Sequence, residues 1–226
     1  MKPYKLVIFD WDGTLMDSAA KIIRCMQIAA RQCDVPVPSD DEVAHIIGIS
    51  LKPAIMQLFD TNDEALTERL RLAYKDAFIG ADATPCPLFD GTETMLNALH
   101  SRGVILAVAT GKARRGLDRA WQNTGTGHFF AASRTADEAH SKPSPDMLLQ
   151  LLEELQLSAG EAVMVGDTIY DMQMAEAIGM DRAGVSYGVH AAVNLEKHHP
   201  EIIVHSIGEL HQWLSDRVSM SQMLPG

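Results

Sequence analysis

The sequence predicts an α/β protein: a doubly wound parallel sheet of the Rossmann-like kind, into which an all-helical segment is inserted. Short apolar runs recur along the chain, helical patterns separate the later runs, and one long interval contains helices alone. Apolar runs without polar alternation are typical of parallel strands buried on both faces. Strands that alternate with helices favour a parallel sheet with right-handed crossovers. The predicted strands are 6–9, 104–109, 129–132, 162–165 and 202–204.

Helical patterns fill the spaces around the later strands. In one of them Ser144 is expected to be the N-cap and Pro145 to lie in the first turn, where its missing N–H has no helical partner anyway. The predicted helices of this part are 91–102, 112–122, 145–155 and 168–179.

The interval between the first and second predicted strands has no strand pattern. Ile22, Met26 and Ala30 belong to an apolar stripe with helical spacing, and segments 51–59 and 63–79 also read as helices. This interval is far longer than a crossover requires, so we expect a separate helical unit. The predicted division is an α/β core, residues 1–14 and 84–226, and a helical cap domain, residues 15–83.

Composition and charge restrict the partners and the location. The chain has 226 residues and a formal net charge of −11, without a cluster of Lys or Arg, so a nucleic-acid partner is disfavoured. The three cysteines are an odd number without zinc-site spacing, which favours free thiols in a reducing compartment. The apolar run at 6–9 is too short for a signal peptide or a membrane span. We therefore expect a cytoplasmic protein with no membrane partner.

Polar motifs follow the predicted strands at their carboxyl ends or precede the next helix. In open parallel sheets these ends meet in one crevice where ligands bind. The candidate residues are Asp10 and Asp12 after the first strand, Thr110 and Gly111 after the second, Lys142 in the loop before helix 145–155, and Asp167 and Asp171 after the fourth.

Each motif allows a chemical interpretation and a simpler one. A tight turn at Gly13 can bring Asp10 and Asp12 around one centre, but an acidic turn or a calcium loop is the alternative. Asp167 and Asp171 are four residues apart at a helix start, so they share one face. Carboxylates without His or Cys suit Mg²⁺. The alternative for Asp167 is an ordinary N-cap.

The second strand end and the loop at Lys142 point to an anion. A hydroxyl at Thr110 and the free amide of Gly111 can form an anion-binding corner at a helix start, although Thr110 could instead cap the helix. Lys142 can supply a point charge for a phosphate or for a carboxylate, although most lysines of a protein surface have no such role.

Taken together, these motifs resemble those of the haloacid dehalogenase superfamily, and within it the phosphoglycolate phosphatase-like branch that has a helical cap. The resemblance covers essentially the whole chain. The matching motifs are D-W-D-G-T-L-M-D-S at 10–18, A-T-G-K at 109–112, S-K-P-S-P-D at 141–146 and G-D-T-I-Y-D at 166–171.

The resemblance implies a phosphatase of small phosphorylated metabolites that forms an aspartyl-phosphate. Asp10 would be the nucleophile and Asp12 the general acid and base. Thr110 and the Gly111 amide would bind the transferring phosphoryl group, and Lys142 would offset its charge. The implied cofactor is Mg²⁺, held by Asp10, the Asp12 carbonyl and Asp167, with Asp171 as a direct or water-mediated ligand.

Several activities remain open on this scaffold. Asp12 disfavours the dehalogenase and phosphonatase branches, which lack an aspartate at that position. Phosphoglycolate or a sugar phosphate is the substrate that the resemblance suggests, and the alternatives are a phosphomutase like β-phosphoglucomutase or an inorganic pyrophosphatase. A non-enzymatic phospho-acceptor domain is disfavoured, because such domains have neither the insert nor the second aspartate. Monomer and homodimer are both left open.

Substrate choice is expected to lie in the inserted helical segment. The loop at 46–52 resembles the family's specificity loop, in which Gly48 permits a turn and Ser50 or Lys52 meets the far end of the substrate. The alternative is a plain connection between two helices. Arg114 and Arg115 also follow the second strand, near the crevice. They could bind an anion of the substrate, although we interpret them as part of a solvated helix face.

Overall fold

The computed structural model describes residues 3–218 and contains one parallel sheet in the order β3-β2-β1-β4-β5-β6. Its central strand β1 pairs with β2 on one side and with β4 on the other. The doubly wound α/β class is therefore confirmed. The strands are β1 Leu6–Phe9, β2 Ile105–Ala109, β3 Ala132–Arg134, β4 Ala162–Gly166, β5 Asp181–Val185 and β6 Ile202–Val204.

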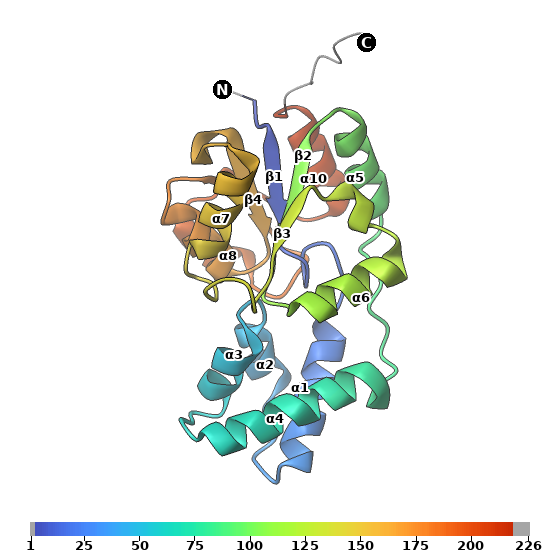
Figure 1. Cartoon of the computed structure of the whole chain (residues 1–226), viewed down its shortest axis with the longest axis vertical. Helices are drawn as coiled ribbons and strands as arrows, with labels where there is room; N and C mark the ends of the chain where they lie inside the picture. Colours follow the sequence, from blue (N-terminus) through green and yellow to red (C-terminus); the bar gives the residue numbers. More distant parts are fainter. Residues whose placement is uncertain (1–2, 219–226) are drawn as a thin grey trace.

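Helices cover both faces of the sheet (Figure 1). Val7 and Phe9 of β1 point to one apolar cluster, which includes residues of α5, α6 and α10, while Leu6 and Ile8 point to another, which includes residues of α7 and α8. This alternation explains why the strand is apolar at every position. The helices are α5 Thr92–Ser101, α6 Arg114–Thr124, α7 Asp146–Leu155, α8 Ile169–Glu176, α9 Ala192–Leu195 and α10 Ile207–Ser215, with short 3₁₀ turns at Gly127–Phe129, Ala159–Glu161 and Glu196–His198.

Two strands differ from the prediction. Strand β5, Asp181–Val185, has no counterpart in it, because the segment begins with two charged residues and contains a glycine. The Tyr4 hydroxyl donates to Asp181 Oδ2 at 2.8 Å, which gives the first of these charges a partner. Strand β3 begins three residues later than expected and ends two residues later, since Phe129 ends a 3₁₀ turn. The helix at Ser144 also begins later, with Pro145 as its N-cap.

The insert between β1 and β2 is helical, as expected, and has an apolar core of its own. Its elements are α1 Ala19–Gln32, α2 Asp40–Ile46, α3 Leu51–Leu58, α4 Glu64–Asp76 and a π-helical turn, η1 Ala77–Ala81. Met26, Ile55 and Leu70 are fully buried among them. Ser39 caps α2 with a capping box, and Asp63 accepts backbone hydrogen bonds at the start of α4. A cap domain bounded at 15 and 83 stays a prediction.

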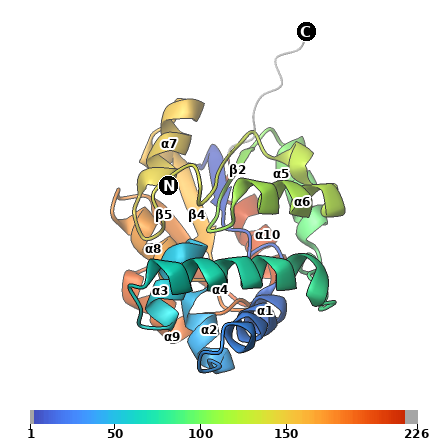
Figure 2. The same ribbon diagram turned by 60° about the horizontal axis from the view of Figure 1, so that its bottom comes forward.

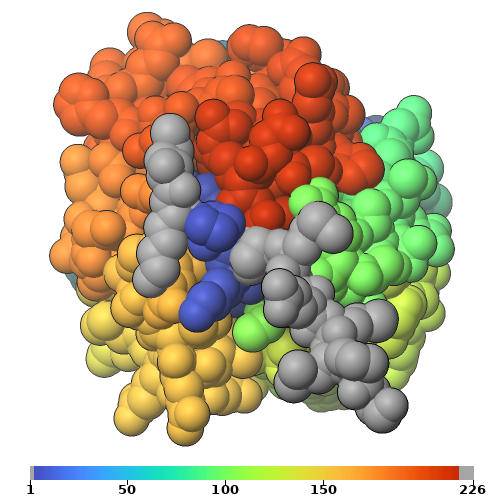
Figure 3. Space-filling model, turned by 90° about the horizontal axis from the view of Figure 1, so that it is seen from above, coloured from blue at the N-terminus to red at the C-terminus, as the bar shows by residue number. Residues whose placement is uncertain are grey.

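The insert lies at one end of the sheet, and the first and last described residues lie at the other (Figure 1). Figure 1 and Figure 2 show α1 to α4 beyond the carboxyl ends of the strands. Figure 3 shows the opposite end, where the first described residues meet the C-terminal segment. There the Tyr4 amide donates to the Arg217 carbonyl at 2.7 Å. No helix within residues 3–218 has both the length and the apolar character needed to cross a membrane.

Candidate active site

The carboxyl ends of three neighbouring strands place the candidate residues side by side. Phe9, the last residue of β1, is in register with Val108 of β2 and with Val165 of β4. The residues that follow these strands are Asp10, Thr110 and Asp167, and all three are buried. Strand pairing alone therefore gathers them at one edge of the sheet.

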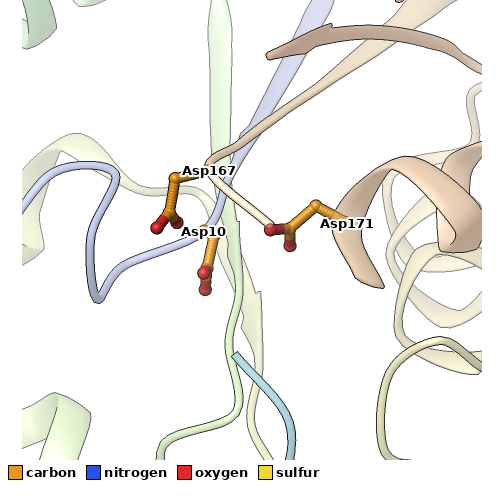
Figure 4. A group of neighbouring side chains, drawn as sticks. All are labelled: Asp10, Asp167 and Asp171. Carbon is orange, nitrogen blue, oxygen red and sulfur yellow. The ribbon is translucent and has the colours of Figure 1, made fainter. Parts of the chain in front are cut away.

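Asp10, Asp167 and Asp171 form a cluster of carboxylates. One oxygen from each lies within 4.8 Å of one oxygen from each of the others. Figure 4 shows the three side chains converging from the end of β1, the end of β4 and the start of α8. Asp167 and Asp171 are completely buried, and Asp10 is 1% exposed.

Lys142 supplies one positive charge to this cluster. Its Nζ atom lies 2.9 Å from Asp10 Oδ1 and 2.6 Å from Asp171 Oδ1, and its side chain is completely buried. Burial alone would lower the pKa of Lys142, but these two carboxylates raise it above its ordinary value. The lysine is therefore charged, and it offsets one of three buried negative charges.

Burial and the remaining negative charge shift the pKa values of two of these aspartates. Burial raises the pKa of Asp10 well above its ordinary value, although Lys142 opposes this rise. Burial, together with the charge of Asp171, raises the pKa of Asp167 to about 7. These shifts mean that the site resists holding all three carboxylates ionised unless another cation is bound.

The site fits Mg²⁺ by its chemistry. All of its ligand atoms are oxygens, which Mg²⁺ prefers. Asp10 Oδ2 is buried without a hydrogen-bond partner among the described residues, and Oδ1 meets Lys142 as an ion pair without hydrogen-bond alignment. A buried carboxylate left in this state is costly, and a bound cation would satisfy it.

Neighbouring groups fix the orientation of the other two carboxylates. Asp167 Oδ1 accepts a hydrogen bond from Thr14 Oγ1 at 2.9 Å, and Asp167 Oδ2 accepts one from the Val189 amide at 2.9 Å. Asp171 Oδ2 accepts from the amide and the hydroxyl of Thr168 in a capping box. Asp167 is therefore not the N-cap of α8, because Thr168 is.

Gly13 makes room for Asp167. It has a φ of +80°, and a Cβ atom at this position would lie 2.2 Å from Asp167 Oδ2. We expected this turn to bring Asp10 and Asp12 around one centre. Both residues line the same cavity, while the Asp12 carboxylate is not part of the cluster of Asp10, Asp167 and Asp171.

The Asp12 side chain has different partners. Its Oδ1 atom accepts a hydrogen bond from Ser18 Oγ at 2.6 Å, and both of its oxygens lie 2.9 Å from Lys112 Nζ. The Lys112 ammonium also lies 5.1 Å from the centre of the Phe78 ring, which belongs to the insert. Lys112 lines the cavity and belongs to the A-T-G-K motif, but the sequence alone assigned it no role.

Thr110 and Gly111 line the same cavity as Asp10. Thr110 is fully buried, and its Oγ1 atom accepts a hydrogen bond from the Lys112 amide at 3.2 Å. It does not cap α6, whose N-cap is Ala113. At Gly111 a Cβ atom would lie 2.6 Å from the Gly48 carbonyl oxygen, so the loop of the insert packs directly on this turn.

Of the three predicted specificity residues, Gly48 lies at this contact and lines the cavity, whereas Ser50 and Lys52 are not among the lining residues. Gly48 has a φ of +104° and packs on Thr168 as well as on Gly111. The Ser50 amide donates to Ser141 Oγ at 2.9 Å, and Ser50 Oγ is buried without a partner in the described part of the chain. Lys52 lies outside the cavity, in an exposed ion pair with Glu64 at 2.8 Å. Its side chain extends toward Glu64, the first residue of α4, instead of toward the cavity.

The parallel sheet gathers this buried group of carboxylates and one lysine at its carboxyl edge, where open α/β proteins bind their ligands. Residues 7–185 match the family model described as haloacid dehalogenase-like hydrolase. The chain belongs to this family.

Individual relatives agree with the family match. The chain is 34% identical over 215 residues to "Probable phosphatase IndB" of Dickeya dadantii, covering 93% of this chain and 92% of that protein. It is 30% identical over 218 residues to a phosphoglycolate phosphatase of Vibrio cholerae, covering 93% and 96%. A crystal structure from Clostridium acetobutylicum, titled as a "predicted phosphatase", superposes with a TM-score of 0.85 at 27% identity over 95% of this chain and all of that one.

These comparisons confirm the predicted superfamily and the assignment of the chain as an enzyme of the hydrolase class with phosphatase relatives. The individual roles of the site residues stay predictions. The same holds for a cytoplasmic location, for the lack of a nucleic-acid partner and for the choice between monomer and homodimer.

Removing one carboxylate should stabilise the metal-free site. Because the pKa of Asp167 is raised in the folded state, folding takes up protons between about pH 4 and pH 7. The stability of the metal-free protein should therefore fall as the pH rises through this range. Asp167→Asn should raise the melting temperature in EDTA at pH 8 and should reduce the further rise that Mg²⁺ causes in wild type.

Thermal unfolding of both proteins at pH 5 and pH 8, with Mg²⁺ or with EDTA, measures these effects. Asp90→Asn, at an exposed position in a turn, is the matched control and should behave as wild type. A wild-type melting temperature that Mg²⁺ leaves unchanged at pH 8 would contradict the assignment of this cluster as a metal site.

Proposed function

We propose that the chain is a Mg²⁺-dependent phosphatase of a small phosphorylated metabolite, and that Asp10 carries the phosphoryl group as an aspartyl-phosphate. The observation that carries this proposal is the state of Asp10, which is a buried carboxylate with an unpartnered oxygen at the floor of a cavity. Lys142 and two further carboxylates surround it. The names of the relatives, phosphatase and phosphoglycolate phosphatase, support the same reaction.

The phosphate ester would bind with its phosphoryl group among Asp10, Thr110 and Gly111, which line one part of the cavity. The Thr110 hydroxyl and the Gly111 amide would donate hydrogen bonds to the phosphoryl oxygens. Lys142 would offset the charge of the phosphoryl group as it approaches a carboxylate. When bound among Asp10, the Asp12 carbonyl, Asp167 and Asp171, Mg²⁺ supplies further positive charge to the phosphoryl oxygens.

In the first step an oxygen of Asp10 would form a bond to phosphorus while the ester P–O bond breaks. Asp12 would donate a proton to the leaving oxygen, so that an alcohol departs. In the second step Asp12 would take a proton from water as the water oxygen bonds to phosphorus and the Asp10–phosphorus linkage breaks. Inorganic phosphate is then released, and both aspartates return to their starting states.

Asp12 is suited to this exchange by its position. It lines the cavity, and it stands outside the group of three carboxylates that would hold the metal. Ser18 and Lys112 fix its carboxylate from two directions. A group that must give and take a proton at one place benefits from such fixed orientation.

Phosphoglycolate or a sugar phosphate is the proposed substrate type. A phosphomutase would return the phosphoryl group to its substrate and release no phosphate. An inorganic pyrophosphatase would release phosphate from pyrophosphate in preference to esters. The release of inorganic phosphate from a panel that includes all of these compounds distinguishes the three activities.

Phosphate release should require both Asp10 and a divalent cation. Wild type with Mg²⁺ should release phosphate from at least one ester of the panel, and EDTA or Asp10→Asn should reduce this release by at least about 10³-fold, because the covalent route is lost. Asp216→Asn, a distant control, should retain the wild-type rate. Release by Asp10→Asn at the wild-type rate would overturn the proposed nucleophile.

Lys112 should act through Asp12. Lys112→Met removes the ammonium group that holds both oxygens of Asp12, so kcat should fall by about tenfold, a part of the 10²–10⁴-fold that a general acid and base provides. KM should change little, because the phosphoryl-binding groups remain. Lys197→Met, at an exposed lysine far from the cavity, is the control. If kcat and KM of Lys112→Met equal those of wild type, Lys112 does not assist catalysis through Asp12.

A further inference from the structure

The cavity above Asp10 is larger than a small phosphorylated acid requires. Its volume is about 640 Å³, and its lining extends from Asp10 and Thr110 in the core to α4 in the insert. This volume lies within the roughly 300–1,000 Å³ of sites that hold drug-sized ligands. Phosphoglycolate fills roughly 270 Å³ even if each of its non-hydrogen atoms takes the ~30 Å³ of a liquid water molecule. More than half of the cavity would then stay empty.

The wall that the insert contributes is mostly apolar. Side chains of α1, the loop before α3, α4 and η1 make up this wall, including Ile22, Ile47, Tyr74 and Phe78. Phe78 is held in place by two ammonium groups, Lys21 and Lys112, each 5.1 Å from its ring centre. Such a wall matches a ligand with an apolar or aromatic body rather than a polyhydroxylated sugar.

Further cations lie on two helices that both line the cavity. Helix α4 contributes Arg71 and Lys75, and helix α6 contributes Arg115 and Arg119. Each pair is spaced by four residues, so its members share one helix face. Figure 2 shows that α4 belongs to the insert and α6 to the layer around the sheet, so the group spans both parts of the fold.

Three of these cations have no carboxylate partner. Arg71 is paired with Glu68, whereas Lys75, Arg115 and Arg119 form no ion pair among residues 3–218. The contrast with Arg114 is clear, because that residue pairs with Glu138 at 2.6 Å and does not line the cavity. In a chain with a formal net charge of −11, unpaired cations around one cavity create a local positive field that attracts an anion.

We infer that Lys75, Arg115 and Arg119 form a subsite for a second anionic group of the substrate. The substrate is then an elongated phosphomonoester with an apolar body between the reacting phosphate and a distant carboxylate or phosphoryl group. This inference rests on the proposed phosphatase function and narrows its substrate class. Asp137 also lines the cavity, but its carboxylate accepts hydrogen bonds from the Arg114 amide and from Thr135.

Arg115 is exposed, as the interpretation of a solvated helix face predicts, and it also lines the cavity. Arg114 and Arg115 are adjacent in sequence, but successive residues of a helix point about 100° apart. Arg114 therefore reaches Glu138 outside the cavity, and Arg115 lines the cavity. The sequence alone gave no means to separate them, because the position of α6 against the insert decides which residue meets the ligand.

A matched series of aryl phosphates tests the subsite. One ester carries a para-carboxyethyl group, the second carries the isosteric para-carbamoylethyl group, and a third ends in a phosphonate. Wild type should show a kcat/KM at least about tenfold higher for the acid than for the amide, because charged hydrogen bonds to arginine are strong. The third ester distinguishes a phosphoryl group from a carboxylate as the preferred distant anion.

The double variant Arg115→Gln/Arg119→Gln should remove this preference. Its kcat/KM for the acid should fall about tenfold to hundredfold, mainly through KM, since the subsite binds substrate and transition state alike. Its kcat/KM for the amide should stay within about twofold of wild type, as binding of the uncharged group does not use these cations. Arg69→Gln, on α4 outside the cavity, should match wild type with both esters.

Other results would overturn the subsite. Equal kcat/KM for acid and amide in wild type would do so, and so would an equal loss for both esters in the double variant. If wild type hydrolyses no ester at all, para-nitrophenyl phosphate included, the proposed function fails on its own. Calorimetric binding of the three esters to Asp10→Asn then decides: tighter binding of the acid supports the subsite, and equal binding of acid and amide refutes it.

Discussion

Three carboxylates lie within 4.8 Å of one another at the carboxyl edge of the sheet, buried and opposed by the single charge of Lys142. This electrostatic imbalance is the feature on which the rest of the site depends. Burial and this imbalance together raise the pKa of Asp10 and of Asp167, and they favour the binding of a cation at the folded site. Hydrogen bonds maintain this imbalance at a cost in stability. Thr14 and the Val189 amide hold Asp167, and Thr168 holds Asp171, at positions where the two carboxylates repel each other.

The helical insert completes the site from the opposite side. Its loop packs on the Gly111 turn, its Phe78 ring contacts Lys112, and the Tyr170 hydroxyl of α8 donates to the His45 carbonyl at 3.0 Å. These contacts join the insert to the core beside the cavity that Asp10 lines. The same insert supplies the apolar wall and part of the distant cationic group, so the chemistry and the choice of substrate are divided between two parts of the fold.

Much of this could be predicted from the sequence because the signals are local. Buried parallel strands are apolar at every position, and the residues that follow them are gathered by strand register, so Asp10, Thr110 and Asp167 could be placed together in advance. Strand β5 could not be predicted in this way, because it begins with charged residues whose hydrogen-bond partners, such as Tyr4, are distant in sequence. The partners of Asp12, the exposed ion pair of Lys52 and the different roles of Arg114 and Arg115 depend on how the insert and the sheet meet, which no local pattern records.

The central claim is that Asp10 receives the phosphoryl group covalently, and trapping that intermediate tests it most directly. Asp12→Asn should slow the second step more than the first, since water attack then lacks its base. Acid quenching of this variant during turnover, followed by mass spectrometry of its peptides, should show one added phosphoryl group on Asp10. A variant that still consumes substrate while Asp10 stays unmodified, or that carries the group on another residue, would contradict the account.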